Sequence, residues 1–265
     1  MLVAKDVLLL TVRPAAPLRS IVECIWHHEG TAAARGRERV LPNGRFQIVL
    51  NLAAATGAIC GLRSQHVVVD TAQTSWVMGV VFRPGGALGC LQTSAVEFYD
   101  SSVPLDGVWG AQANRLLEQL CEAASAEQRL RILERTVTAR IRGVAEKQRA
   151  IHPAVGHALR AFHNSPRVTT VAQVSQETGW SRRWFSHSFR EQVGMTPKSY
   201  CRLIRFQKVI QQIAADRRVD WTEVALACGY CDQAHLVHEF RAFSGLTPER
   251  FVRAERPFPN HVRAD

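Results

Sequence analysis

The spacing of hydrophobic residues changes once along the chain, near residue 103. Before it, short apolar runs at 46–50, 66–69 and 75–82 are separated by turn residues, which predicts β-strands across 19–100. After it, apolar residues recur at helical spacing and predict two helices within 103–141. The residues that set this spacing are Leu116, Leu117, Leu120, Leu130, Ile132, Leu133, Val137 and Ile141. We therefore expect a β-sandwich or barrel-like domain closed by helices.

The second half of the chain contains an internal duplication. The segment 189–200 aligns with 240–251, with Phe, Arg, Gly, Thr and Pro identical at matching positions. Upstream, 174–180 aligns with 224–230, so the second copy has one extra residue in its turn. A repeated supersecondary unit of this kind predicts a repeated function.

Each copy has the pattern of a helix, a glycine-centred turn and a second helix. Gly179 and Gly229 are placed to end the first helix in a left-handed conformation, and Ser181 and Asp232 are good N-caps for the second. This is the pattern of a helix-turn-helix. An apolar face along 200–215 predicts one helix connecting the two copies.

The second helix of each copy has two different faces. At about 100° per residue, Phe185 and Phe189 share one face, as do Leu236 and Phe240, while polar and basic residues occupy the other. Such a helix fits the major groove of DNA, although a basic face on a single helix is more often merely solvated. The predicted DNA contacts are Arg182, Arg183, Ser186, His187 and Arg190 in the first copy, and Gln233, Ala234, Val237, His238 and Arg241 in the second.

Two residues lie between these faces. Trp184 and His235 fall near 200° on the helical wheel, where each is as suited to packing against a neighbouring helix as to touching DNA. We leave both interpretations open for them.

Composition supports a nucleic-acid partner. The 265 residues carry a net charge of +10, and residues 151–265 alone hold 16 basic and 10 acidic side chains. Charged and hydrophobic fractions of 21% and 46% are those of an ordinary folded protein, and no apolar run is long enough for a membrane span. Seven scattered cysteines without a signal peptide predict reduced thiols and a cytoplasmic location.

Residues 151–255 resemble the paired helix-turn-helix domain of AraC/XylS-type transcription regulators. The resemblance rests on Val174-Ser175, Gly179-x-Ser181, Phe185 and Phe189-Arg190, on Gly194-x-Thr-Pro197 and Arg205, and on the matching second set from Val224 to Phe251. His187 and His238 stand where the family usually has a basic residue. The resemblance implies seven helices, with two recognition helices that read successive major-groove segments of double-stranded DNA.

The resemblance also implies that the chain consists of domains with different functions. We expect a sensory or oligomerisation domain at 1–145, a DNA-binding all-α domain at 146–258 and a tail at 259–265, which makes an α+β protein of two domains. Residues 146–265 are expected to fold alone. The charged stretch 140–149 is the expected linker. RNA polymerase, as the partner of an activator, is implied by the family, while a small-molecule effector and a homodimer stay open.

Two residue groups have partial metal-ligand patterns, and two other functions fit the same sequence. Cys228 and Cys231 have metal spacing but lack a second pair, and His27-His28-Glu29 lacks a third ligand at suitable spacing, so we expect no metal, no cofactor and no catalytic residues. A cupin-like enzyme domain fused to a DNA-binding domain, and an effector-independent DNA-binding protein, are the alternatives to a ligand-controlled regulator.

Overall fold

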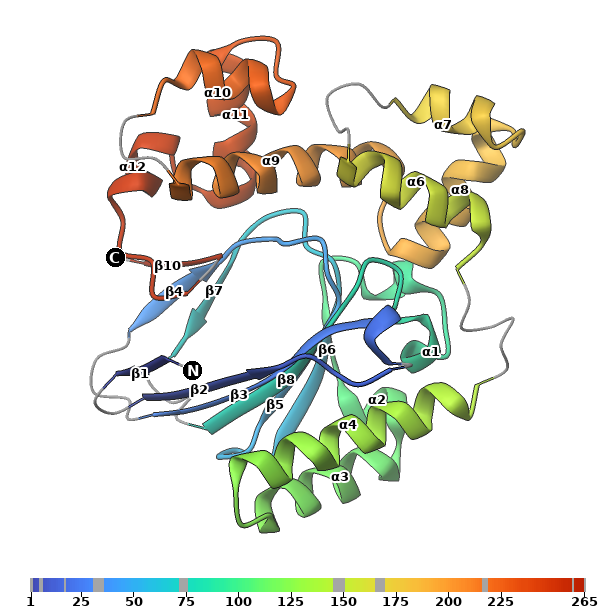
Figure 1. The fold of residues 1–265 in the computed structure, drawn as a ribbon, viewed down its shortest axis with the longest axis vertical. Coiled ribbons are helices and arrows are strands. Elements are labelled where there is room, and N and C mark those ends of the chain that lie inside the picture. Colours follow the sequence, from blue (N-terminus) through green and yellow to red (C-terminus); the bar gives the residue numbers. More distant parts are fainter. Residues whose placement is uncertain are drawn as a thin grey trace. The chain divides into compact units, whose positions relative to one another are not determined.

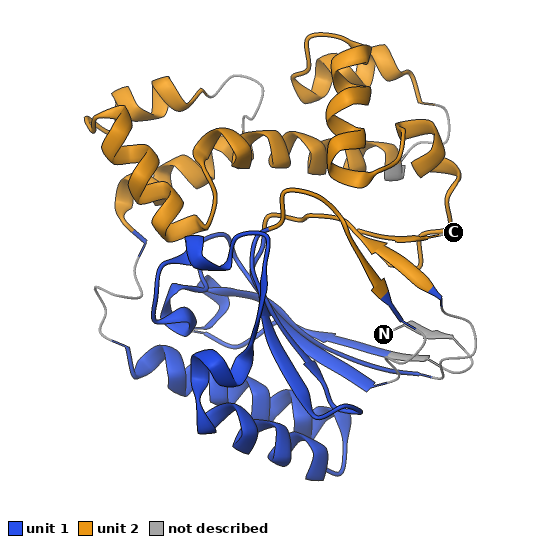
Figure 2. Ribbon diagram, turned by 180° about the vertical axis from the view of Figure 1, so that it is seen from behind, with its two compact units in different colours: residues 1–36, 45–62, 70–151 blue, residues 37–44, 63–69, 152–265 orange. Residues whose placement is uncertain are grey.

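The computed structural model describes residues 2–4, 7–16, 18–30, 36–71, 76–144, 151–164, 170–215, 219–258 and 260–264. The chain divides into two compact units (Figure 2). Unit 1 comprises residues 1–36, 45–62 and 70–151, and unit 2 comprises 37–44, 63–69 and 152–265. Within the described residues, no helix is both long and apolar enough to cross a membrane.

Unit 1 is built on one antiparallel sheet, ordered β1-β2-β3-β8-β5-β6-β9 (Figure 1). Alternate residues of the central strands face a core, as Ile48 and Leu50 do at 0% exposure. The described sheet ends at β1 and β9 and does not close into a barrel. Its strands are β1 Leu2–Ala4, β2 Val7–Val12, β3 Val22–Gly30, β5 Gln47–Asn51, β6 Thr56–Cys60, β8 Trp76–Phe82 and β9 Ser102–Pro104.

Helices follow the sheet in sequence, as the hydrophobic spacing predicts. All eight apolar residues that set the helical period are buried, and the two long helices α3 and α4 run side by side next to the sheet (Figure 1). The Arg140 guanidinium lies 4.7 Å from the Trp109 ring centre and donates to the Gln112 amide oxygen at 2.8 Å. The elements are η1 Leu18–Ser20, α1 Leu88–Leu91, η3 Ala95–Phe98, α2 Leu105–Trp109, α3 Ala111–Glu122 and α4 Ala126–Arg142.

Unit 2 contains seven helices within the described residues, in agreement with the resemblance. The first helix-turn-helix pairs α7 with α8, the second pairs α10 with α11, and the 19-residue α9 connects them. Buried aromatic rings form the core: Phe162 meets Phe189, and Phe206 meets Phe240. The helices are α6 Pro153–Asn164, α7 Val171–Glu177, α8 Arg182–Val193, α9 Pro197–Ala215, α10 Trp221–Cys228, α11 Gln233–Ser244 and α12 Pro248–Arg253.

Residues 146–258 are all-α where the structure describes them, as expected, but unit 2 also includes a three-stranded sheet from segments outside that range, ordered β10-β4-β7. Its strands are β4 Arg37–Val40, β7 Val67–Asp70 and β10 His261–Arg263. The expected tail therefore supplies a strand, and β4 comes from the part of the chain assigned to the first domain. Antiparallel pairing of Val262 with Arg39, and burial of Val262 at 0% exposure, hold these distant segments together.

The structure describes only part of the expected linker at 140–149. Its first residues belong to α4, which ends at Arg142. Residues 145–150, including the expected boundary at 145/146, lie outside the described residues.

Candidate nucleic-acid interface

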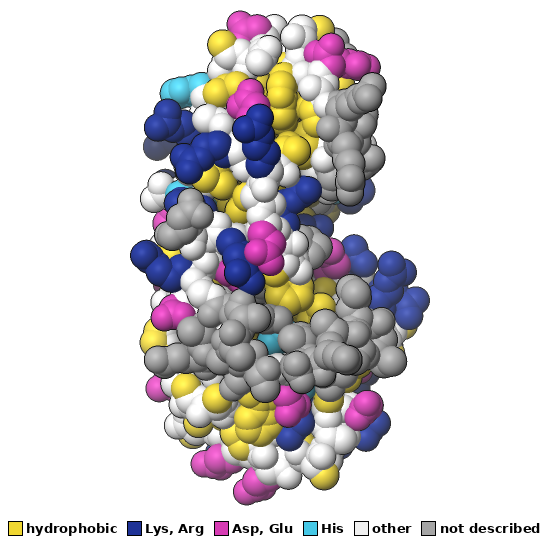
Figure 3. Space-filling model, turned by 90° about the vertical axis from the view of Figure 1, so that its left-hand side faces the viewer, with side chains coloured by type: hydrophobic (Ala, Val, Ile, Leu, Met, Phe, Trp, Pro, Cys, Tyr) yellow, Lys and Arg dark blue, Asp and Glu magenta, His cyan; other side chains and the backbone are white. Residues whose placement is uncertain are grey.

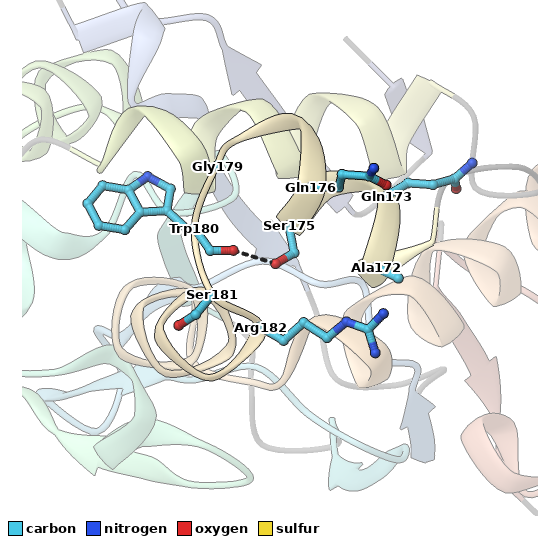
Figure 4. A pocket seen from close by; sticks show the side chains of 8 residues that line it. All are labelled: Ala172, Gln173, Ser175, Gln176, Gly179, Trp180, Ser181 and Arg182. Atoms are coloured by element: carbon cyan, nitrogen blue, oxygen red, sulfur yellow. Dashed lines mark hydrogen bonds between the residues drawn. The ribbon is translucent and has the colours of Figure 1, made fainter.

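The first helix-turn-helix is fixed by local hydrogen bonds. Thr170 and Gln173 form a reciprocal capping box at the start of α7. Across the turn, the Ser175 hydroxyl donates to the Trp180 carbonyl oxygen at 2.7 Å (Figure 4). Gly179 adopts the predicted left-handed conformation, with φ +71°, and the Ser181 hydroxyl accepts from the Trp184 amide. These bonds determine how α8 leaves the turn.

The residues predicted on α8 are accessible. Arg182, Arg183, His187 and Arg190 are exposed and Ser186 is half-buried. The opposite face holds Phe185, Phe189 and Val193, which are buried. The division into two faces that the helical wheel predicts is present in the structure.

Trp184 packs within unit 2. Its ring stacks on Trp180 with centroids 3.8 Å apart and meets the His152 ring edge-on at 4.8 Å. Trp180 itself stays 41% exposed, in the turn that precedes α8. The wheel could not identify this aromatic cluster, because His152 comes from the segment preceding α6.

A hollow of about 580 Å³ lies beside this turn, between α7 and the start of α8. Polar side chains such as Gln173 and Gln176 line it, and Figure 4 shows the Arg182 guanidinium extending along it. The complete lining is Ala172, Gln173, Ser175, Gln176, Gly179, Trp180, Ser181 and Arg182.

The second helix-turn-helix repeats the same local chemistry. Asp220 caps α10 by accepting from two backbone amides at 2.9 and 3.1 Å, and Asp232 caps α11 by accepting from the His235 amide at 2.7 Å. Gly229 is left-handed, with φ +84°. The His235 ring meets Tyr230 edge-on at 5.2 Å, so it packs within the turn.

The residues predicted on α11 are also accessible. Gln233, Ala234, His238 and Arg241 are exposed and Val237 is half-buried. The buried side of α11 is formed by Leu236, Glu239, Phe240, Phe243 and Ser244. Figure 3 shows dark-blue Lys and Arg side chains on the upper part of the face that it views.

Glu239 is a buried carboxylate that is not among the residues predicted from the sequence. Both of its oxygens accept from Arg202 of α9, at 2.7 and 2.6 Å. Burial by itself raises the pKa of Glu239, but the hydrogen bonds and charge of Arg202, with the charges of His235 and Arg205, lower that pKa overall. Its position three residues after Leu236 places it on the core face, which is the signal that could have found it.

Arg205 of α9 contacts the turn of the second helix-turn-helix. Its guanidinium lies 5.5 Å from the Tyr230 ring centre and donates to the Gly229 carbonyl oxygen at 3.5 Å. The connecting helix therefore anchors the turn through Arg205 and α11 through Arg202.

The cysteines and histidines that have metal-ligand spacing in the sequence contact other groups in the structure. Cys228 is buried and its thiol contacts the Gln212 amide oxygen at 3.3 Å, while Cys231 is exposed. In unit 1, the Trp76 indole donates to the His27 ring at 3.2 Å, and burial lowers the pKa of that histidine. The described part of the chain contains no group of three or more His, Cys, Asp or Glu residues suited to a metal ion.

Family comparisons divide the chain in two. Residues 174–254 match a family described as a helix-turn-helix domain, and residues 10–104 match a domain of unknown function (DUF6597). The "Probable transcriptional regulator LumQ" of Photobacterium leiognathi is 29% identical over 82 residues, which cover 31% of this chain and 33% of LumQ. The match thus spans about a third of that relative.

Two solved structures have partial similarity to this chain. The C-terminal domain of AraT from Geobacillus stearothermophilus is 20% identical, covering 39% of this chain and 86% of that one, with a TM-score of 0.37. ToxT from Vibrio cholerae O395, bound to (E)-4-(8-methylnaphthalen-1-yl)but-3-enoic acid, is 9% identical, covering 94% and 99%, with a TM-score of 0.46. The chain combines a helix-turn-helix domain at residues 174–254 with a domain of unknown function at residues 10–104.

Proposed function

We propose that this protein is a sequence-specific DNA-binding transcription regulator that reads two successive major-groove segments with α8 and α11. The observation that carries the proposal is the duplicated exposure pattern. Each second helix presents polar and basic residues to solvent on one face and buries phenylalanines on the other.

The exposed side chains have chemistry that distinguishes bases. Arg183 is suited to a bidentate contact with guanine, and Gln233 to one with adenine. Arg190 and Arg241, in the last turns of α8 and α11, supply positive charge suited to phosphates. Ser186, His187, Ala234, Val237 and His238 complete the two proposed reading faces, with Arg182 beside the polar hollow.

The first domain is proposed to control this DNA binding, through a small molecule or through oligomerisation. An effector would act by its different affinity for two states of the chain. A ligand of this kind is expected to raise the melting temperature of the full-length protein and to change its occupancy of DNA together. RNA polymerase is the further partner that we propose for an activator of this type.

The test begins with selection of duplexes from a random library by the full-length protein. Arg183→Ala should weaken binding to the selected duplex by roughly 1–3 kcal/mol and relax the preference at one or two base pairs. Gln233→Ala should do the same at a different position. Arg160→Ala is the matched control, because Arg160 is an exposed arginine of α6 outside both reading faces.

The base-reading assignment has a clear contrary result. If Arg183→Ala weakens binding equally on the selected duplex and on unrelated DNA, Arg183 contacts phosphate instead. If no duplex is enriched at any salt concentration, the proposed function itself is wrong, because phosphate contacts alone should give binding that weakens as salt rises.

A further inference from the structure

Two segments from the first half of the chain are structural parts of unit 2. We call residues 37–44 and 63–69 together the arm. The first segment pairs with the C-terminal strand β10, and the Leu41 amide donates to the Asn260 carbonyl oxygen at 2.8 Å. Glu38, 3% exposed, accepts from the His261 ring at 2.8 Å.

The arm is fastened to the connecting helix α9. Gln207, only 8% exposed, donates through its side-chain nitrogen to the Pro42 carbonyl oxygen at 2.6 Å and to the Asn260 side chain at 3.0 Å. Gly44 is left-handed, with φ +72°, and a β-carbon there would lie 3.5 Å from the Leu203 side chain. The backbone of the arm therefore approaches α9 closely.

The arm also caps the second recognition helix. The last carbonyl groups of a helix have no partner within it, and the His66 amide donates to one of them, that of Phe243 in α11, at 2.8 Å. The His66 ring lies against the Gly245 turn that ends α11, where an added β-carbon would come within 2.5 Å of it.

Arg39 orients the His66 ring. The guanidinium has only donors, so at 3.0 Å it requires the His66 Nε2 atom to accept and places the ring proton on Nδ1. A neutral ring agrees with burial and the Arg39 charge, both of which lower the His66 pKa. Arg39 of β4 and His66, the residue before β7, thus meet at the end of α11.

We propose that the arm positions α11, with His66 and Arg39 as its positioning residues. Through it, unit 1 influences the DNA half-site read by α11 more than the one read by α8. Residues 45–62 of unit 1, which contain β5 and β6, connect the two arm segments covalently, and this connection is the proposed route of that influence. The half-site part of this inference rests on the proposed function, whereas the positioning of α11 does not.

The first experiment uses full-length protein without DNA. Hydrogen exchange is compared for wild type, His66→Ala and Gln65→Ala, the last being the control at the exposed neighbouring residue. His66→Ala should speed exchange of the His66-position, Gly245 and Leu246 amides roughly tenfold or more, with the amides of 190–194 at the end of α8 unchanged. Equal exchange at 245–246 in all three proteins would overturn the proposal, as would an equal increase at both helix ends.

A second set of variants tests the close contact at the helix end. Gly245→Ala should strain the backbone and push against His66, whereas Gly179→Ala meets nothing within 4 Å at the same φ of +71°. Adding His66→Ala should reduce the effect of Gly245→Ala on exchange at 245–246, because it removes the obstructing ring. Additive effects in the double variant would contradict a shared contact.

The third experiment uses the duplex selected by the full-length protein, with one half-site scrambled at a time. His66→Ala and Arg39→Gln should weaken binding roughly tenfold where only the α11 half-site is intact, and less than twofold where only the α8 half-site is intact. Equal weakening on both would overturn the half-site selectivity. Should no duplex be selected, the proposed function fails, while the exchange measurements still decide whether the arm positions α11.

Discussion

Arg202 donates to both carboxylate oxygens of Glu239, at 2.7 and 2.6 Å, and thereby joins the connecting helix to the second recognition helix. The Glu239 side chain is 8% exposed and that of Arg202 is 38% exposed. Losing its partner should therefore cost the Glu239 carboxylate more free energy than it costs the Arg202 guanidinium, since the buried carboxylate has less access to water.

Removing Arg202 should cost more stability than removing the charge of Glu239. Arg202→Met leaves a buried carboxylate without its cation and should lower the free energy of unfolding by about 3 kcal/mol. Glu239→Gln keeps the shape and some hydrogen bonding and should cost about 1–2 kcal/mol. Urea unfolding of the single and double variants measures both. An equal loss of unfolding free energy in the two single variants would contradict the expectation drawn from the unequal burial of the two side chains.

The same ion pair makes stability depend on pH in a defined direction. The net effect of its surroundings lowers the Glu239 pKa below its usual 4.5, so the folded state holds the carboxylate charged more readily than the unfolded state does. This contribution is complete above pH 4.5 and is lost as the pH falls through the lowered pKa. The difference in unfolding free energy between wild type and Glu239→Gln should therefore shrink below pH 4.5, and a constant difference would exclude the pair as its source.

Replacing the glycine in the turn of the second helix-turn-helix should destabilise the protein. Gly229 has φ +84°, so Gly229→Ala should destabilise the protein by about 1 kcal/mol and Gly229→Val by more. Gly107 in helix α2 has open space around its β-carbon position and serves as the control. Gly107→Ala should be neutral or stabilising, because alanine favours a helix. Thermal melting of the three variants provides the measurement.

The two recognition helices should read DNA at a set spacing. The 19 residues of α9 span roughly 28 Å at 1.5 Å per residue, comparable with the roughly 34 Å of one DNA turn. We expect two half-sites about 10 base pairs apart on one face of the duplex. Inserting about five base pairs should abolish joint binding by rotating one half-site away. Binding that tolerates this insertion would mean that the helices act separately.

The isolated segment 146–265 should be less stable than unit 2 within the whole chain. It lacks β4 and β7, leaving Val262 without its strand neighbour and Gln207 without the Pro42 carbonyl. The sequence predicts that this segment folds alone, whereas in the structure β4 and the Pro42 carbonyl contact residues that the segment would leave without these partners. Hydrogen exchange at 203–209 is compared in the segment and in the full chain. Faster exchange in the segment would show that it is less stable, and equal exchange would show that it folds fully without β4 and β7.

Local interactions explain why much of the fold and of the candidate interface could be predicted from sequence. Gly179 and Gly229 end helices because a left-handed residue is needed there, and Ser181 and Asp232 cap the helices that follow. Each of these depends on neighbours within a few residues. The two faces of α8 and α11 likewise follow from helical periodicity, and their exposure agrees with the wheel.

Tertiary structure alone decided which distant residues complete these elements. Trp184 packs on His152 rather than projecting from the helix, Arg202 neutralises Glu239, and His66 caps α11 from a segment more than 170 residues earlier. Composition and periodicity report which face of a helix is apolar, and they carry no information on which strand will reach a free carbonyl at its end. That choice depends on long-range strand pairing and on close packing, which arise only when the whole chain is folded.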